Sequence, residues 1–310
     1  MENNKLLIMI TTYSRGENLP AVVESIVKQT FKNYKILICD DRSPNDPTEI
    51  INGIKSKYPN VNIEHHRNYN NIGEGLNINV ALGREYDNHF KYLALLQDDT
   101  VYLDNNFLSN GIYMLEQNPD ASYFGGKPNK LVPLINSPQN LLFVKINGLD
   151  FWRMWSKIAV HWAACIFRFD EIINYRLKAA PRKDVVNGDS LQLLNMAMKS
   201  YVIMKNEVVL DIEFNKTGQG YERFYKDPVD RFLKVEKYYR LASESAVEHG
   251  VSKQEAELWL LNQQLGLAWM AINRIGKNKE QREKFMTVLM DYDKKLSISI
   301  INAMLNLMIR

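Results

Sequence analysis

Two adjacent carboxylates, Asp98 and Asp99, follow the apolar run Tyr92–Leu96. An apolar run without polar alternation is typical of a strand that is covered on both faces, as in the parallel sheet of an α/β protein. The carboxylates then lie at the carboxyl end of the strand, where open α/β sheets bind ligands. Because neighbouring negative charges repel each other, such a pair usually needs a cation or hydroxyl donors. The pattern indicates a divalent metal that carries a diphosphate, and an acidic turn in water is the alternative.

Two other apolar runs also end in polar loops. Leu6–Ile10 is followed by the loop Thr11–Arg15, and Tyr34–Cys39 is followed by Asp40–Asp46. Since the carboxyl ends of parallel strands meet at one edge of a sheet, we expect these loops to form a single pocket with the acidic pair.

The elements that must position these loops alternate between strand and helix. Helical spacing of apolar residues follows the first two loops, and a turn at residues 70–75 precedes a short helix at 76–84. This alternation predicts an α/β fold with a mostly parallel sheet, right-handed crossovers and flanking helices. Three prolines favour loops between residues 127 and 147, whereas helical periods from residue 227 onward predict a helical C-terminal region.

The amino-acid composition limits the classes of protein to which this chain can belong. The 310 residues are 45% hydrophobic and 24% charged, as in an ordinary globular protein. A net charge of +3 is too small to indicate a nucleic-acid partner. The two cysteines, Cys39 and Cys165, imply no disulfide framework, and the N-terminus has no signal-peptide pattern. We therefore expect a cytoplasmic location.

Asp189 stands where a helix begins, two residues before the helical run Leu191–Lys199. A carboxylate at this place either caps the helix, by accepting hydrogen bonds from free backbone N–H groups, or points into the pocket. Residue type and spacing alone leave both roles open.

The C-terminal segment Leu296–Ile309 is largely apolar and follows a basic stretch at residues 273–284. Such a segment can lie in a membrane interface, or it can pack on its own helical bundle or on a second subunit. We therefore name the C-terminal helices as candidates for peripheral contact with the inner face of the membrane or for homodimerisation.

Taken together, the polar strand ends resemble those of the family 2 glycosyltransferases with the GT-A fold. The resemblance covers about residues 5 to 215 and rests on the order and spacing of five short motifs: Thr11-Thr12-Tyr13-Ser14-Arg15, Cys39-Asp40-Asp41-Arg42-Ser43, Asn71-Ile72-Gly73 with Asn79, Gln97-Asp98-Asp99, and Gly188-Asp189. It implies a GT-A domain at residues 1–226, with a nucleotide-sugar half at about 1–126 and an acceptor half at about 127–226, followed by the helical region at 227–310.

The resemblance also implies an activity and site residues. The protein would move a sugar from a nucleotide-diphosphate sugar, most simply a UDP-sugar, to a hydroxyl of a glycan or lipid-linked acceptor in surface polysaccharide or glycoconjugate synthesis. Asp99 would ligate Mn2+ or Mg2+, and Asp189 would be the general base of an inverting transfer. The donor would contact the strand ends and the turn before the third helix, through Thr11, Tyr13, Arg15, Asp41, Asn71, Gly73 and Asp98.

Two features depart from the family pattern, and two other functions compete with it. Gln97 stands where an aspartate is common, and Arg42 stands where a glycine is common. A nucleotidyltransferase on a similar scaffold usually has a glycine-rich basic loop after its first strand, which Thr11–Arg15 lacks. A catalytically silent sugar-nucleotide-binding scaffold protein is the other alternative, and the presence of both Asp99 and Asp189 argues against it.

Overall fold

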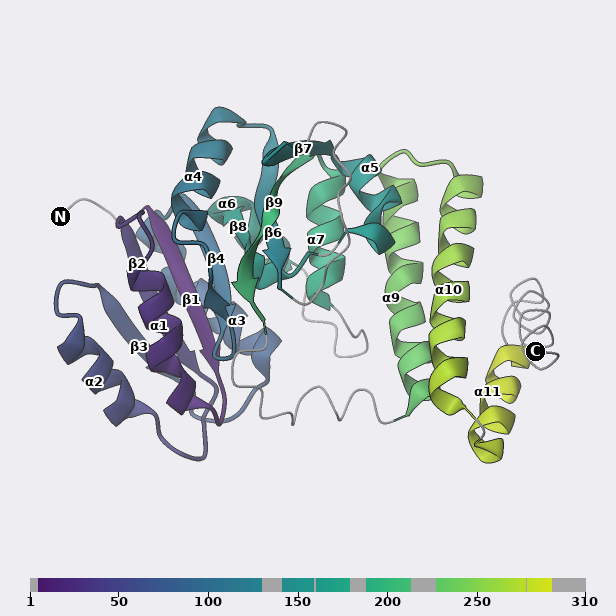
Figure 1. Ribbon diagram of the computed structural model, residues 1–310, viewed down its shortest axis with the longest axis horizontal. Coiled ribbons are helices and arrows are strands. Elements are labelled where there is room, and N and C mark those ends of the chain that lie inside the picture. The colour runs from purple at the N-terminus through teal and green to yellow at the C-terminus, as the bar shows by residue number, and fades with distance from the viewer. Residues whose placement is uncertain are drawn as a thin grey trace. The chain divides into compact units, whose positions relative to one another are not determined.

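The computed structural model describes residues 5–129, 141–158, 160–178, 188–212, 227–276 and 278–291 (Figure 1). The chain divides into two compact units. The first contains Met1–Pro181 and Gln192–Lys216, and the second contains Arg182–Leu191 and Thr217–Arg310. The acidic pair and the loops predicted to join it all belong to the first unit.

A four-stranded parallel sheet forms the first half of this unit. Its order is β3-β2-β1-β4, and every residue of β1 and β2 is buried, which explains their unbroken apolar runs. The right-handed crossovers place α1 and α2 on one face of the sheet and α3 on the other (Figure 1). These elements are β1 (Leu6–Thr12), α1 (Leu19–Val27), β2 (Tyr34–Asp40), α2 (Thr48–Lys57), β3 (Ile63–Arg67), α3 (Glu74–Glu85) and β4 (Tyr92–Gln97).

The second half extends the same sheet with both parallel and antiparallel pairs. Strand β8 is antiparallel to β4 and to β6, and β9 is parallel to β6, while β5 and β7 are both antiparallel to β9. The strands are β5 (Val101–Tyr102), β6 (Ala121–Pro128), β7 (Phe143–Asn147), β8 (Cys165–Arg168) and β9 (Tyr201–Asp211). The helices are α4 (Phe107–Gln117), α5 (Gly148–Arg153), α6 (Phe169–Lys178) and α7 (Gly188–Met198), with single 3-10 turns at η1 (Gly16–Asn18), η2 (Tyr86–Asn88), η3 (Trp155–Lys157) and η4 (Trp162–Ala164).

The predicted loop at 127–147 is partly wrong. Strand β6 continues through Lys127 to Pro128, and β7 occupies Phe143–Asn147. Proline is tolerated where a strand ends, so Pro128 marks the end of β6 and does not exclude the strand. Residues 130–140 lie outside the described part of the chain.

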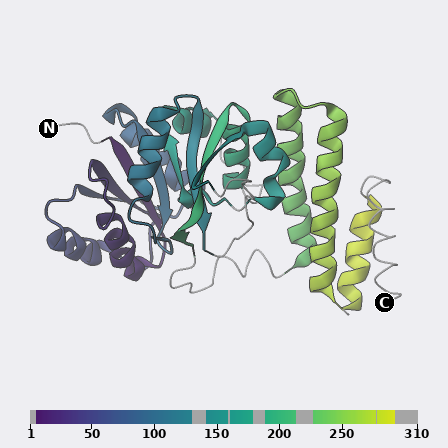
Figure 2. The same ribbon diagram turned by 45° about the horizontal axis from the view of Figure 1, so that its top comes forward.

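The second unit is helical, as the sequence predicts. It contains α9 (Pro228–Glu248), α10 (Lys253–Ile275) and α11 (Lys279–Asp291), and Figure 2 shows α9 and α10 side by side. Side chains cap the first two helices, Asp227 for α9 and Ser252 for α10. The ring of Phe232 in α9 packs edge-on against Phe285 in α11, with centroids 5.3 Å apart.

No helix among the described residues is long and apolar enough to cross a bilayer. The segment Leu296–Ile309, which is the candidate for membrane contact or dimerisation, lies outside the described residues.

Candidate functional site

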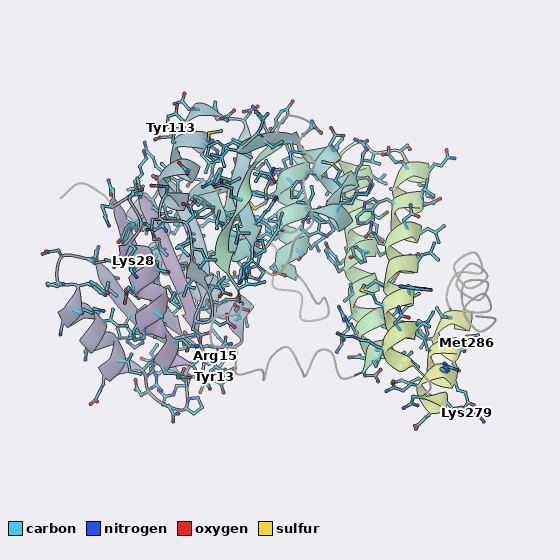
Figure 3. All side chains as sticks on the ribbon, in the orientation of Figure 1. Tyr13, Arg15, Lys28, Tyr113, Lys279 and Met286 are labelled. Carbon is cyan, nitrogen blue, oxygen red and sulfur yellow. The ribbon has the colours of Figure 1, made fainter. Side chains whose placement is uncertain are left out.

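The carboxyl ends of β2, β1 and β4 lie side by side, as predicted. Cys39 pairs with Thr11, and Thr11 pairs with Gln97. Just beyond these pairs, the backbone N–H of Asp98 donates to the Thr11 carbonyl at 3.0 Å, which holds the acidic turn against β1. Tyr13 and Arg15 lie together at this end of β1 (Figure 3). Three loops from distant parts of the chain therefore meet at one sheet edge.

Arg15 bridges the two carboxylates of the acidic pair. Its guanidinium nitrogens lie 2.5 Å from Asp98 Oδ1 and 2.7 Å from Asp99 Oδ2. The second oxygen of Asp98 accepts hydrogen bonds from the Thr12 hydroxyl at 2.8 Å and the Tyr13 N–H at 3.2 Å. The like charges are thus stabilised by a cation and a hydroxyl donor, both supplied by the loop after β1.

Burial separates the roles of the two aspartates. Asp98 is completely buried, and this burial raises the pKa of its carboxyl to about 6, although Arg15 and Thr12 oppose the shift. The paired carboxylates in turn raise the pKa of Arg15 against the effect of its own burial. Asp99 is 8% exposed, and one of its oxygens accepts a hydrogen bond from Arg15. Asp98 therefore organises the loop, and Asp99 is the carboxylate better placed to reach a ligand.

Asp41 organises the turn before α3. Its oxygens accept hydrogen bonds from the Asn68 side chain at 2.9 Å, from Ile72 N at 3.0 Å and from Gly73 N at 2.7 Å. Gly73 has a φ of 85°, a conformation that favours glycine and lets its N–H turn toward the carboxylate. Asn71 is exposed on the same turn. An ionised carboxylate has about four acceptor positions, so Asp41 retains capacity for one more donor.

Sequence reasoning missed the structural role of Asp40. This buried carboxylate accepts from Ser43 N at 2.9 Å and from Arg67 Nε at 2.7 Å. Arg67 also donates to the Ser43 carbonyl at 2.7 Å. The network fixes the path of the loop after β2, and thereby the position of the neighbouring Asp41.

We expect Asp40→Ala to lower the free energy of unfolding by about 3 kcal/mol, because it removes the buried partner of an ion pair and leaves Arg67 Nε without its acceptor. Urea denaturation measures the change. Asp46→Ala is the matched control, since Asp46 also contacts Arg67, at 3.1 Å, but is half exposed; its loss should be much smaller than that of Asp40→Ala. Equal losses in the two variants would contradict the structural role of Asp40.

Glu74 is a second residue that sequence reasoning missed. Its Oε1 accepts from the Gln97 amide at 2.9 Å and from the Thr11 hydroxyl at 3.2 Å. Gln97, at the position where the family often has an aspartate, is thus paired with a carboxylate that comes from the first turn of α3. No local signal links two residues 23 positions apart, so only the fold reveals the pair.

Asp189 lies in the first turn of α7, where a negative charge is favourable at a helix N-terminus. It is partly exposed and belongs to the second compact unit. Its role as a base stays a prediction.

Comparison with known proteins identifies related sequences. The family model described as "Glycosyl transferase family 2" matches residues 7–172, more than half of the chain. The UDP-Glc:alpha-D-GlcNAc-diphosphoundecaprenol beta-1,3-glucosyltransferase WfaP of Escherichia coli is 34% identical over 112 residues, which are 35% of this chain and 40% of WfaP. Glycosyltransferase GlyG of Streptococcus pneumoniae is 24% identical over 114 residues, which are 37% of this chain and 36% of GlyG. The alignments thus span well under half the length of these relatives.

Solved structures share the fold over nearly the whole chain. Residues 1–349 of S. aureus TarS in complex with UDP-GlcNAc give a TM-score of 0.67 at 16% identity, covering 93% of this chain and 80% of that one. The mannosyltransferase PcManGT of Pyrobaculum calidifontis, in complex with GDP-Man and Mn2+, gives 0.60 at 16% identity, covering 99% and 81%. These likenesses confirm the predicted GT-A-type fold.

Proposed function

This chain belongs to glycosyl transferase family 2. On that basis, we propose that it transfers a sugar from a UDP-sugar to a hydroxyl of a glycan or lipid-linked acceptor. The observation that carries the proposal is the pair Asp98 and Asp99 at the carboxyl end of β4, cross-linked by Arg15. Relatives support the donor and acceptor classes: the name of WfaP specifies UDP-Glc and a diphosphoundecaprenol acceptor, and TarS was solved with UDP-GlcNAc. The transfer would be one step in the synthesis of a surface polysaccharide or glycoconjugate.

In this proposal the strand-end loops bind the donor nucleotide. Thr11 and Tyr13 line the nucleotide pocket, and Tyr13 is 46% exposed, so its ring is available to a ligand. Asp41 accepts a hydrogen bond from the nucleotide base at the acceptor position that its three protein donors leave open. Asn71 and Gly73 lie on the turn that Asp41 holds. Asp98, which is buried, would act at the ribose or sugar by positioning Arg15 and the loop after β1. The guanidinium of Arg15 is a donor set well matched to phosphate oxygens.

Asp99 would hold Mn2+ or Mg2+. Among the described residues, no group of three or more His, Cys, Asp or Glu side chains is suited to a metal. The site nevertheless fits such an ion, because Mg2+ is commonly held by one or two carboxylates together with substrate phosphates and water. When bound, the metal would stabilise the negative charge that develops on the departing diphosphate.

Asp189 would accept the proton of the acceptor hydroxyl as the sugar is transferred. A hydroxyl is a weak nucleophile until its proton is removed, and a carboxylate acting opposite the leaving group gives inversion at the anomeric carbon. A catalytically silent scaffold protein would bind the same donor but lack this step.

Calorimetric titration with UDP, GDP and their sugar conjugates tests the proposal, first with Mn2+ and then with EDTA. We expect metal-dependent binding of UDP and of one UDP-sugar, followed by turnover when an acceptor is added. Metal-dependent binding without turnover on any hydroxyl acceptor would favour the silent scaffold. Absence of nucleotide binding would overturn the proposed donor site.

A further inference from the structure

Three lysines in the described part of the chain are buried, and one of them has no counter-charge. Lys35 lies 2.9 Å from Glu85 and 2.8 Å from Glu64, and Lys205 lies 2.6 Å from Asp104 and 3.1 Å from Glu207. Lys127, near the end of β6, is only 6% exposed, yet its side chain forms no hydrogen bond or ion pair with any residue that the structure describes.

The pKa values show the same difference. Burial disfavours the charged form of all three lysines, but the carboxylates around Lys35 and Lys205 overcome this effect and raise the pKa of each. For Lys127 burial is the sole cause of the shift, and it lowers the pKa. The described residues therefore do not neutralise Lys127, and a partly desolvated charge without a partner is costly to stability.

The register through β8 places Lys127 beside the candidate active site. Ala94 of β4 pairs with Ile166 of β8, and Ile166 pairs with Phe124 of β6. Since both pairs are antiparallel, β4 and β6 are parallel to each other, and Ala94 lies at the same height in the sheet as Phe124. Three residues further along each strand stand Gln97 and Lys127. Lys127 therefore lies about two strand spacings, roughly 10 Å, from the residue that precedes the acidic pair.

The register through β9 leads back to the same edge. Pro128, the neighbour of Lys127, pairs with Leu210 of β9, and Leu210 pairs with Tyr102 of β5. Tyr102 is the third residue after Asp99, so the chain that leaves the acidic turn rejoins the sheet level with the end of β6, with β9 between them. The end of β6 and the acidic turn thus lie on one edge from both directions.

We propose that Lys127 binds an anionic group, a phosphate or a carboxylate, on the acceptor. This rests on the proposed function. The residues assigned to the donor come from β1, β2, β4 and the turn before α3, and Arg15 already faces the carboxylates there. Lys127 lies two strands further along the sheet, beyond β8, where a second substrate can approach the donor. An acceptor anion would supply the counter-charge that the described residues do not provide.

The first test compares thermal stability without any ligand. Methionine has nearly the length of lysine and no charge, so Lys127→Met should raise Tm by about 3 °C or more, since it removes an unpaired buried charge. Lys205→Met is the matched control and should lower Tm, because Asp104 loses its partner. A lower Tm in Lys127→Met would show that the fold itself needs the charge and would overturn the proposal. Lys127→Gln repeats the comparison should the methionine variant not fold.

The second test titrates the wild type with methyl phosphate and with acetate, and follows Tm. The donor site is first filled with a saturating nucleoside diphosphate and Mg2+. We expect one of the two anions to raise Tm, and Lys127→Met to weaken this effect about tenfold or more, as for a charge-assisted hydrogen bond. Lys145→Met, which changes an exposed lysine paired with Asp120, should leave it unchanged.

Three outcomes would overturn the proposal: no rise in Tm with either anion, an equal rise in the wild type and Lys127→Met, or a rise that disappears once the donor site is filled. The last would assign Lys127 to the donor diphosphate. If no nucleotide binds in the first place, the proposed function fails, yet the anion titration without nucleotide still shows whether Lys127 forms an anion site.

Discussion

Asp99→Asn is expected to weaken metal-supported nucleotide binding by about 100-fold or more. The substitution keeps the shape of the side chain but removes the negative charge that would hold the cation, and even changes to residues that merely support a metal ligand cost about 10- to 100-fold in affinity. Calorimetric titration with UDP and Mn2+ measures the loss, and titration in EDTA gives the metal-independent remainder.

The fold should survive this substitution, because Arg15 retains its contact with Asp98, 2.5 Å away. An unchanged Tm would therefore separate the loss of a ligand from the loss of structure. Asp120→Asn is the matched control: Asp120 is an exposed carboxylate paired with Lys145, and it directly precedes β6 at the opposite edge of the sheet. An unchanged affinity in Asp99→Asn would mean that Asp99 pairs with Arg15 but holds no metal.

The parts of the site that the sequence predicts are those formed by continuous apolar strands. β1, β2 and β4 are buried on both faces, so their runs stand out and their polar ends are easy to locate. Parallel pairing then brings the ends together by a general rule, and the structure confirms that Thr11, Asp41 and Asp98 meet at one edge.

The parts that the sequence does not predict depend on pairings across long stretches of chain. Asp40 and Asp41 look equivalent as neighbours, yet only the fold shows that Arg67 neutralises the first and that backbone N–H groups bind the second. Lys127 follows two glycines and precedes a proline, which is typical of a loop. Its burial becomes visible only once β6 is placed between β8 and β9.

Asp189→Asn is expected to lower kcat by about 10²- to 10⁴-fold, which is the usual contribution of a general base, while nucleotide affinity stays nearly unchanged. Asparagine keeps the size of the side chain and can still accept a hydrogen bond at a helix N-terminus, so α7 should be little affected. The measurement pairs kcat for sugar transfer with the dissociation constant of UDP, determined on the same preparation.

Two comparisons separate the role of a base from that of a helix cap. Asp170→Asn is the matched control, because Asp170 also stands in the first turn of a helix, α6, and is exposed. If both variants lose a similar, small amount of Tm and only Asp189→Asn loses turnover, the carboxylate of Asp189 acts on the acceptor. If Asp189→Asn instead lowers Tm markedly and its activity falls only in proportion to the unfolded fraction, Asp189 stabilises α7, and the base must be sought among other carboxylates. Because loss of a base lowers turnover and loss of a cap lowers stability, kcat and Tm together decide between the two roles.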